Sequence, residues 1–163
     1  MTPERTLDID LTRQRLRLLH GAQCVAEYLV STARNGPGER INSECTPRGW
    51  HVIGQKIGSG AAAGAVFVGR VPTGEVWSPT FAATQPPGRD WILTRILWLE
   101  GLEPGRNAGG EVDSRARYIY LHGTPDTSRM GVPGSRGCVR MRNTDIIELF
   151  DRVAEGDRVF LHE

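Results

Sequence analysis

The stretch HGTPDTSRMGVPGSRGCVRM, from His122 to Met141, follows a run of strand-forming residues and carries a glycine-rich turn. It contains one histidine and one cysteine, in a chain that has only four histidines and three cysteines. The preceding RYIYLH predicts a strand that ends at His122. A strand end and a turn can bring His122 and Cys138 together. The spacing alone leaves two interpretations open: a Cys–His catalytic pair, or a small buried thiol beside an unrelated imidazole.

The length and composition indicate one folded domain. The chain has 163 residues, with 39% hydrophobic and 24% charged residues. We expect a single domain over residues 1–163, with its core in about 14–162. The formal net charge of +1 predicts no nucleic-acid partner, and no apolar run is long enough for a membrane span.

Alternating apolar and polar residues predict a mainly β fold with one late α-helix. NTDIIELFDRV favours a helix over 143–153, capped by Asn143 or Thr144. Cys24 falls inside a strand pattern and is expected in the core, whereas Cys45 lies in a long Gly- and Pro-rich loop. The clearest strand patterns are at 13–20, 24–32, 50–53, 66–71, 91–101, 117–122 and 158–162.

The residues around Cys138 suit nucleophilic chemistry. A cysteine attacks as its thiolate, and a nearby histidine can accept its proton. Arg136 and Arg140 flank Cys138. If they face inward, they lower the pKa of the thiol or hold an anionic substrate. Gly137 lets the backbone approach a reacting carbonyl, so that neighbouring N–H groups could form an oxyanion hole. No Cys or His spacing typical of a zinc site is present, so we expect neither a metal nor a cofactor.

The segment YIYLHGTPD…MGVPGSRGCVRMRNTDIIELF resembles the L,D-transpeptidase catalytic domain family, also called YkuD. The family's signature is a histidine, a gap, and then Ser/Thr-His-Gly-Cys with a hydrophobic residue. Here His122 opens the signature, and residues 135–140 close it. Upstream, VSTARNGPG…CTPRGWHVI is also similar, and the resemblance covers about 16–161. Two departures, Arg136 in place of histidine and Arg140 in place of asparagine, put the finer oxyanion and substrate contacts in doubt.

The resemblance implies a β-sandwich catalytic domain in which Cys138 is the nucleophile and His122 is the base. It implies a peptidoglycan stem tetrapeptide or muropeptide as donor. Cys138 would cleave the L,D bond before the terminal D-alanine through a thioester. Water or the amine of a second stem would then resolve this thioester. The residues expected to contact the substrate or its oxyanion are Ser135, Arg136, Gly137, Arg140 and Gly123.

The acceptor depends on where the protein works. The start MTPERTLDIDLTRQRLRLLHG lacks the apolar run of a secretory signal. We therefore expect a cytoplasmic L,D-carboxypeptidase of cell-wall recycling. The alternatives are an exported L,D-transpeptidase that cross-links periplasmic peptidoglycan, if the sequence is part of a longer chain, and a non-catalytic peptidoglycan-binding module. The sequence leaves open the acceptor, the donor length, the oligomeric state, the host, and whether Arg136 and Arg140 bind substrate.

Overall fold

The computed structural model describes residues 4–163, so residues 1–3 of the predicted domain lie outside the described part. Its helices are α1 (Pro79–Ala82) and α2 (Asn143–Arg152), and a 3-10 turn spans Gly110–Val112. Within residues 4–163, no helix is long and apolar enough to cross a membrane. The strands are β1 (Arg5–Asp10), β2 (Arg15–His20), β3 (Gln23–Ser31), β4 (Gly49–Ile57), β5 (Ala65–Val68), β6 (Val71–Val76), β7 (Ile92–Gly101), β8 (Tyr120–Gly123), β9 (Val139–Met141) and β10 (Arg158–His162).

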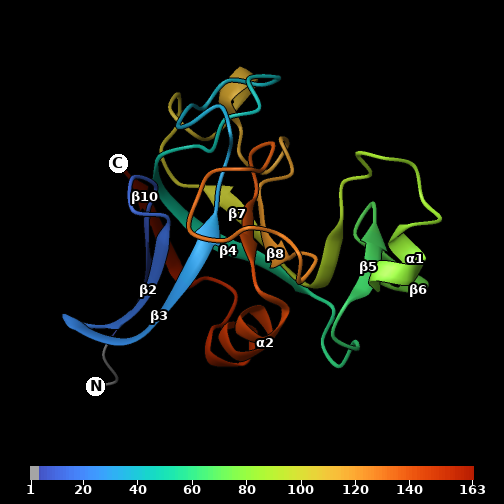
Figure 1. The fold of residues 1–163 in the computed structure, drawn as a ribbon. Coiled ribbons are helices and arrows are strands. Elements are labelled where there is room, and N and C mark those ends of the chain that lie inside the picture. Colours follow the sequence, from blue (N-terminus) through green and yellow to red (C-terminus); the bar gives the residue numbers. More distant parts are fainter. Residues whose placement is uncertain (1–3) are drawn as a thin grey trace.

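The strands form one curved, barrel-like sheet in the order β4-β10-β1-β2-β3-β9-β8-β7-β5-β6. A further pairing between β4 and β7 closes the strands from β4 to β7 on themselves. The β5–β6 hairpin extends from β7 at one side of the molecule (Figure 1). The predicted mainly β class is confirmed, but the arrangement differs from two packed sheets. The reason is that β7 pairs with β8 on one edge and with β4 on the other, which closes the sheet between β4 and β7 and leaves β6 as its edge strand.

Strand β1 extends the core beyond the predicted 14–162. Leu7 and Ile9 are fully buried, and β1 pairs in parallel with β10 near the end of the chain. The alternation in RTLDID is short and includes two acidic residues. It is therefore a weak strand signal until β10 supplies a partner from the other end of the sequence.

Four local predictions are wrong. The strand expected over 66–71 ends at Val68, because Gly69 and Arg70 adopt φ values of +55° and +66° in the turn between β5 and β6. The strand expected over 117–122 begins only at Tyr120, because residues 114–118 form turns and Tyr118 adopts a left-handed φ of +57°. Helix α2 is capped by Arg142, without a side-chain hydrogen bond. Asn143 lies inside the helix, and its side chain contacts other elements. Cys24 is exposed, since the end of the β2–β3 hairpin reaches past the core beyond a bulge at Val25 of β3.

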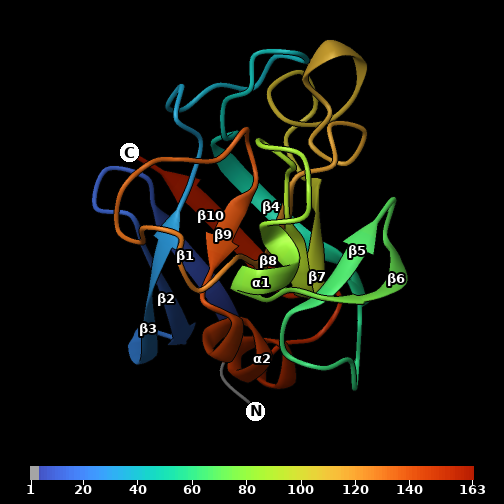
Figure 2. The same cartoon turned by 45° about the vertical axis from the view of Figure 1, so that its right-hand side comes forward.

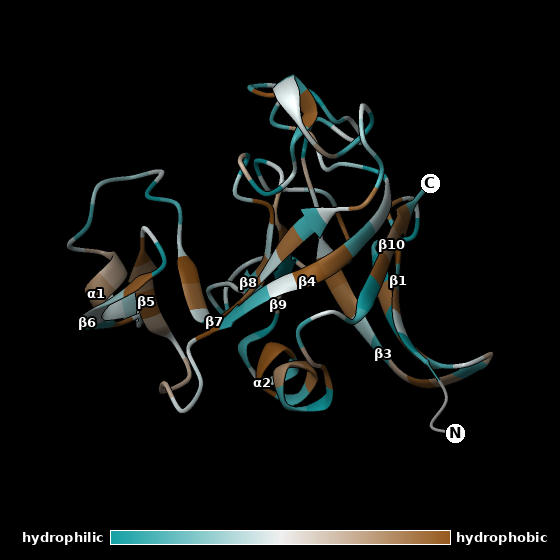
Figure 3. Ribbon diagram, turned by 180° about the vertical axis from the view of Figure 1, so that it is seen from behind, coloured by the Kyte–Doolittle hydropathy of each residue, from teal (hydrophilic) through white to brown (hydrophobic). Residues whose placement is uncertain are grey.

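The main core fills the inside of the curved sheet and extends to α2. Helix α2 lies below the sheet (Figures 1 and 2) and contributes Ile146, Leu149 and Phe150 to this core. Hydrophobic residues are concentrated on the strands and on one face of α2, whereas the long loops are more hydrophilic (Figure 3). A second, smaller cluster of Phe67 and its neighbours packs around β5, β7 and β8. The core thus holds β8 and β9 from two sides.

The parallel pairing of β8 with β9 places the predicted site residues. Leu121 pairs with Val139, and His122 pairs with Arg140. Because side chains alternate across a strand, Leu121 and Val139 point into the core. His122 and Arg140 therefore share the opposite face. Cys138 directly precedes β9, so the same alternation brings it to this face.

We expect Leu121→Ala to destabilise the domain strongly. Leu121 is fully buried at the centre of β8, and such truncations cost about 2–5 kcal/mol. Leu102→Ala is the matched control, because Leu102 is 40% exposed and should cost less than about 1 kcal/mol. Urea denaturation measures both free energies of unfolding. Equal losses for the two variants would contradict the described packing.

Candidate active site

His122 and Cys138 line one cavity of about 220 Å³, although the structure shows no hydrogen bond between them. His122 is supplied by β8, and Cys138 by the turn before β9. His122 is almost completely buried, whereas Cys138 is partly exposed. The structure therefore brings the two predicted catalytic residues to one surface of the sheet.

The hydrogen bonds of His122 determine which ring nitrogen can act as a base. Its Nδ1 lies 2.6 Å from the carbonyl oxygen of Gly123. A carbonyl can only accept, so Nδ1 carries the proton and Nε2 of the neutral ring keeps a lone pair. Burial lowers the pKa of His122 to about 4. At neutral pH the ring is therefore an uncharged base.

The Cys138 thiol is protonated at rest, contrary to the expectation of a lowered pKa. Its Sγ donates to the Tyr118 carbonyl oxygen at 3.2 Å and accepts from the Tyr120 amide at 3.3 Å. Burial among apolar neighbours raises the pKa of the Cys138 thiol to about 12, and the Tyr120 amide and the charge of Arg140 oppose this increase only in part. The expectation fails because Arg136 is exposed and Arg140 is paired with an acid. The resting pair is thus thiol and imidazole.

The turn from Ser135 to Cys138 is held by a network that leaves little freedom. The Ser135 hydroxyl donates to the Cys138 carbonyl at 2.6 Å and accepts from the Gly137 amide at 3.2 Å. Gly137 has a φ of +138°, and a Cβ there would meet the Cys45 carbonyl at 3.2 Å. Thr46 donates to the Gly137 carbonyl at 2.9 Å. Ser135 and Gly137 thus shape the turn, and in this state the Gly137 amide is occupied by Ser135.

Arg140 and Arg136 have different surroundings. Arg140 forms an ion pair with Asp90 at 3.4 Å and donates to the Gly134 carbonyl at 3.2 Å. It therefore braces the wall of the cavity. Arg136 lines the same cavity and makes no ion pair within residues 4–163. Within that range, no group of three or more His, Cys, Asp and Glu side chains could hold a metal ion.

Comparison with known proteins identifies the family. The sequence profile of the YkuD family, the L,D-transpeptidase catalytic domain, matches residues 4–161. This chain belongs to the L,D-transpeptidase catalytic domain family. It is 49% identical over 77 residues to a protein named as the L,D-transpeptidase YkuD of Bacillus licheniformis, a match that covers 47% of this chain and 44% of the relative. It is 30% identical over 114 residues to one named as ErfK/SrfK of Salmonella typhimurium, with 70% and 32% coverage. The matches span less than half the length of these curated relatives.

Solved structures show the same fold for this L,D-transpeptidase domain. An L,D-transpeptidase from Mycobacterium smegmatis superposes with a TM-score of 0.58 at 14% identity, covering 99% of this chain and 59% of that one. An L,D-transpeptidase from Xylanimonas cellulosilytica gives a TM-score of 0.53 at 20% identity, with 99% and 62% coverage. At these identities the likeness concerns the fold alone.

Sequence reasoning missed several residues of the transpeptidase cavity. Tyr118 and Tyr120 supply the backbone groups that contact Cys138. Asp90 and Arg117 also line the cavity. The alternation of RYIYLH could have placed Tyr120 on the face of His122. No sequence signal marks Asp90 or Arg117, because both come from irregular segments. Gly123, expected near the oxyanion, instead contributes the carbonyl that orients His122.

We expect the reactivity of Cys138 to keep rising into the alkaline range. The thiolate is the reactive form, so a raised pKa means about a tenfold rate increase per pH unit until that pKa is approached. The measurement is the alkylation rate by iodoacetamide in a Cys24→Ser/Cys45→Ser background, from about pH 6 to about pH 10. A plateau at or below about pH 8 would instead show a stabilised thiolate.

Proposed function

We propose that this domain is a cysteine acyl-transfer enzyme that cleaves the L,D bond before the terminal D-alanine of a peptidoglycan stem tetrapeptide. The observation that supports the reaction is that Cys138 and the neutral, oriented His122 line one cavity. A nucleophile beside a base that is itself held by a third group is the arrangement that acyl transfer needs. Family membership supports the choice of substrate.

In the proposed first half-reaction, Cys138 Sγ attacks the carbonyl carbon of the scissile bond while His122 Nε2 accepts the thiol proton. The tetrahedral intermediate then collapses. The C–N bond breaks, and the imidazolium returns its proton to the leaving amine of D-alanine. This leaves a thioester on Cys138 and a neutral His122. The Tyr120 amide, 3.3 Å from the sulfur, stabilises negative charge that develops there before the new bond is complete.

The neutral resting pair makes proton transfer part of the substrate-bound step. With the His122 pKa near 4 and the Cys138 pKa near 12, the free enzyme holds almost no thiolate–imidazolium pair. Bound substrate supplies an electrophile that consumes the thiolate as it forms. This arrangement keeps the thiol unreactive when the cavity is empty.

For the second half-reaction we propose water as the acceptor, which makes the enzyme an L,D-carboxypeptidase. His122 removes a proton from water, and the resulting hydroxide attacks the thioester. The tetrahedral intermediate then collapses, the C–S bond breaks, and the imidazolium of His122 returns its proton to the sulfur, which releases the tripeptide and the Cys138 thiol. The amine of a second stem arrives as an ammonium ion. The positive charges of the unpaired Arg34 and Arg136 beside the cavity repel this ammonium ion, whereas they do not repel a neutral water molecule. A role in recycling within the cytoplasm stays a prediction.

We expect Cys138→Ser to reduce D-alanine release from a disaccharide tetrapeptide by about 10³-fold or more, because a serine hydroxyl is a far weaker nucleophile here. Cys24→Ser is the matched control, since Cys24 is exposed at the far end of the β2–β3 hairpin. Circular dichroism verifies that both variants fold. Equal rates for wild type and Cys138→Ser would remove Cys138 from the mechanism.

Mass spectrometry of the wild-type products tests the acceptor. We expect the tripeptide to be the main product. Cross-linked dimers with little tripeptide would overturn the choice of water and support transpeptidation. No release of D-alanine by a folded sample would contradict acyl transfer itself and favour a binding module.

A further inference from the structure

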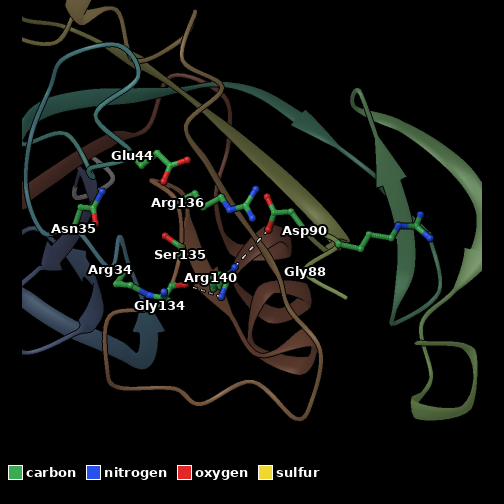
Figure 4. Close-up of a pocket in the computed structure, with 10 residues that line it drawn as sticks. Arg34, Asn35, Glu44, Gly88, Asp90, Gly134, Ser135, Arg136 and Arg140 are labelled. Carbon is green, nitrogen blue, oxygen red and sulfur yellow. Dashed lines mark hydrogen bonds and ion pairs between the residues drawn. The ribbon is translucent and has the colours of Figure 1, made fainter. Parts of the chain in front are cut away.

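A larger groove of about 600 Å³ adjoins the catalytic cavity (Figure 4). The two share four lining residues, namely Asp90, Ser135, Arg136 and Arg140. Arg34, Asn35 and Glu44 line the groove but not the cavity of Cys138. A ligand bonded to Cys138 can therefore continue from the cavity into the groove, where Arg34 is among the lining residues.

The arginines of the groove fall into two classes. Arg140 is paired with Asp90 at 3.4 Å, and Arg89 is paired with Glu75 at 2.8 Å. Arg34 and Arg136 form no ion pair with any carboxylate of residues 4–163, and both are exposed. Because neither guanidinium is neutralised by a carboxylate, the two arginines on one groove leave a local excess of positive charge.

Both unpaired arginines are fixed to the catalytic turn through the backbone. The Arg34 amide donates to the Ser135 carbonyl at 2.9 Å, and Ala33 forms a parallel bridge with Ser135. Arg136 itself lies within the turn that Ser135 and Gly137 brace. The backbones of the two arginines thus belong to one hydrogen-bonded unit, and both side chains line the groove.

We propose that Arg34 and Arg136 bind a carboxylate of the stem peptide remote from the scissile bond, so that the enzyme prefers stems with free branch carboxylates to stems with carboxamides. The identity of the ligand as a stem peptide rests on the proposed function. The planar guanidinium matches a carboxylate with two parallel hydrogen bonds. A carboxamide removes the charge and replaces an acceptor with a donor, which faces the donors of arginine without compensation.

Glu44 supplies an internal check on this assignment. It is exposed on the same groove and has no ion pair among the described residues. Its charge repels a bound carboxylate, so its removal should strengthen the preference that the arginines create. A role of the arginines in folding alone would not predict opposite effects from Arg34 and Glu44.

The experiment compares two stem tetrapeptides that differ only in their branch carboxylates, which are free in one and converted to carboxamides in the other. The terminal D-alanine is free in both. We expect wild-type enzyme to favour the free peptide in kcat/KM by about tenfold at low salt, and less at high salt, because exposed charges are screened. Equal kcat/KM values for the two peptides would overturn the proposal while leaving acyl transfer intact.

The variants locate the effect. Arg34→Gln and Arg136→Gln should each reduce the preference by about three- to fivefold, mainly through KM, whereas Glu44→Gln should increase it. Arg129→Gln is the matched control, since Arg129 is exposed, lines neither space and makes no ion pair within residues 4–163. A change of preference in Arg129→Gln equal to that in Arg34→Gln would mean a general charge effect and would contradict a site.

Calorimetry with Cys138→Ala separates this proposal from the function on which it rests. We expect the free peptide to bind this inactive variant more tightly than the carboxamide peptide, and Arg34→Gln to reduce this difference by about three- to fivefold. If the wild type releases no D-alanine but the binding difference persists, acyl transfer fails and the carboxylate site stands. If both peptides bind Cys138→Ala equally, the carboxylate site fails, whatever the activity.

Discussion

The carbonyl oxygen of Gly123 orients the base of the site, and it can do so only because Gly123 has no side chain. It lies 2.6 Å from Nδ1 of the preceding His122. A Cβ on Gly123 would collide with Asn143 Oδ1, with the Leu93 carbonyl oxygen at 2.6 Å and with Thr94 Oγ1 at 2.9 Å. Thr94 in turn donates to Asn143 Oδ1 at 2.6 Å. Strands β7 and β8 and the first residue of α2 thus meet at the residue that fixes His122.

Burial sets the protonation states of His122 and Cys138, and these states matter for the reaction as much as the positions of the two residues do. The cluster around Phe67, Ile96 and Tyr120 packs against Cys138, and the same lack of water around His122 favours its neutral form. Separating charge in this environment costs free energy that binding of the substrate has to offset. The site is therefore prepared to transfer a proton during attack rather than to store a thiolate.

Sequence patterns predict the elements that depend on residues close together in the chain. They do not predict features that depend on contacts between segments far apart in the sequence. Alternation was sufficient for β3, and residues that favour strands, Ile, Thr and Trp, were sufficient for β7. The glycine-rich turn between His122 and Cys138 was sufficient to propose the pair. The closure of the sheet through β4 and β7 has no local signal. The same holds for Asp90, which reaches Arg140 from a loop 50 residues away. The raised pKa of Cys138 was also missed, because flanking arginines say nothing about which way their side chains point.

The most direct test of this account is the tautomer of His122 in the free enzyme at neutral pH. Protein labelled with ¹⁵N-histidine allows both ring nitrogens to be observed by NMR, and His122→Gln assigns the signals. We predict a neutral ring with the proton on Nδ1 and an unprotonated Nε2 available to the Cys138 thiol. A proton on Nε2, or an imidazolium paired with a thiolate, would contradict the account.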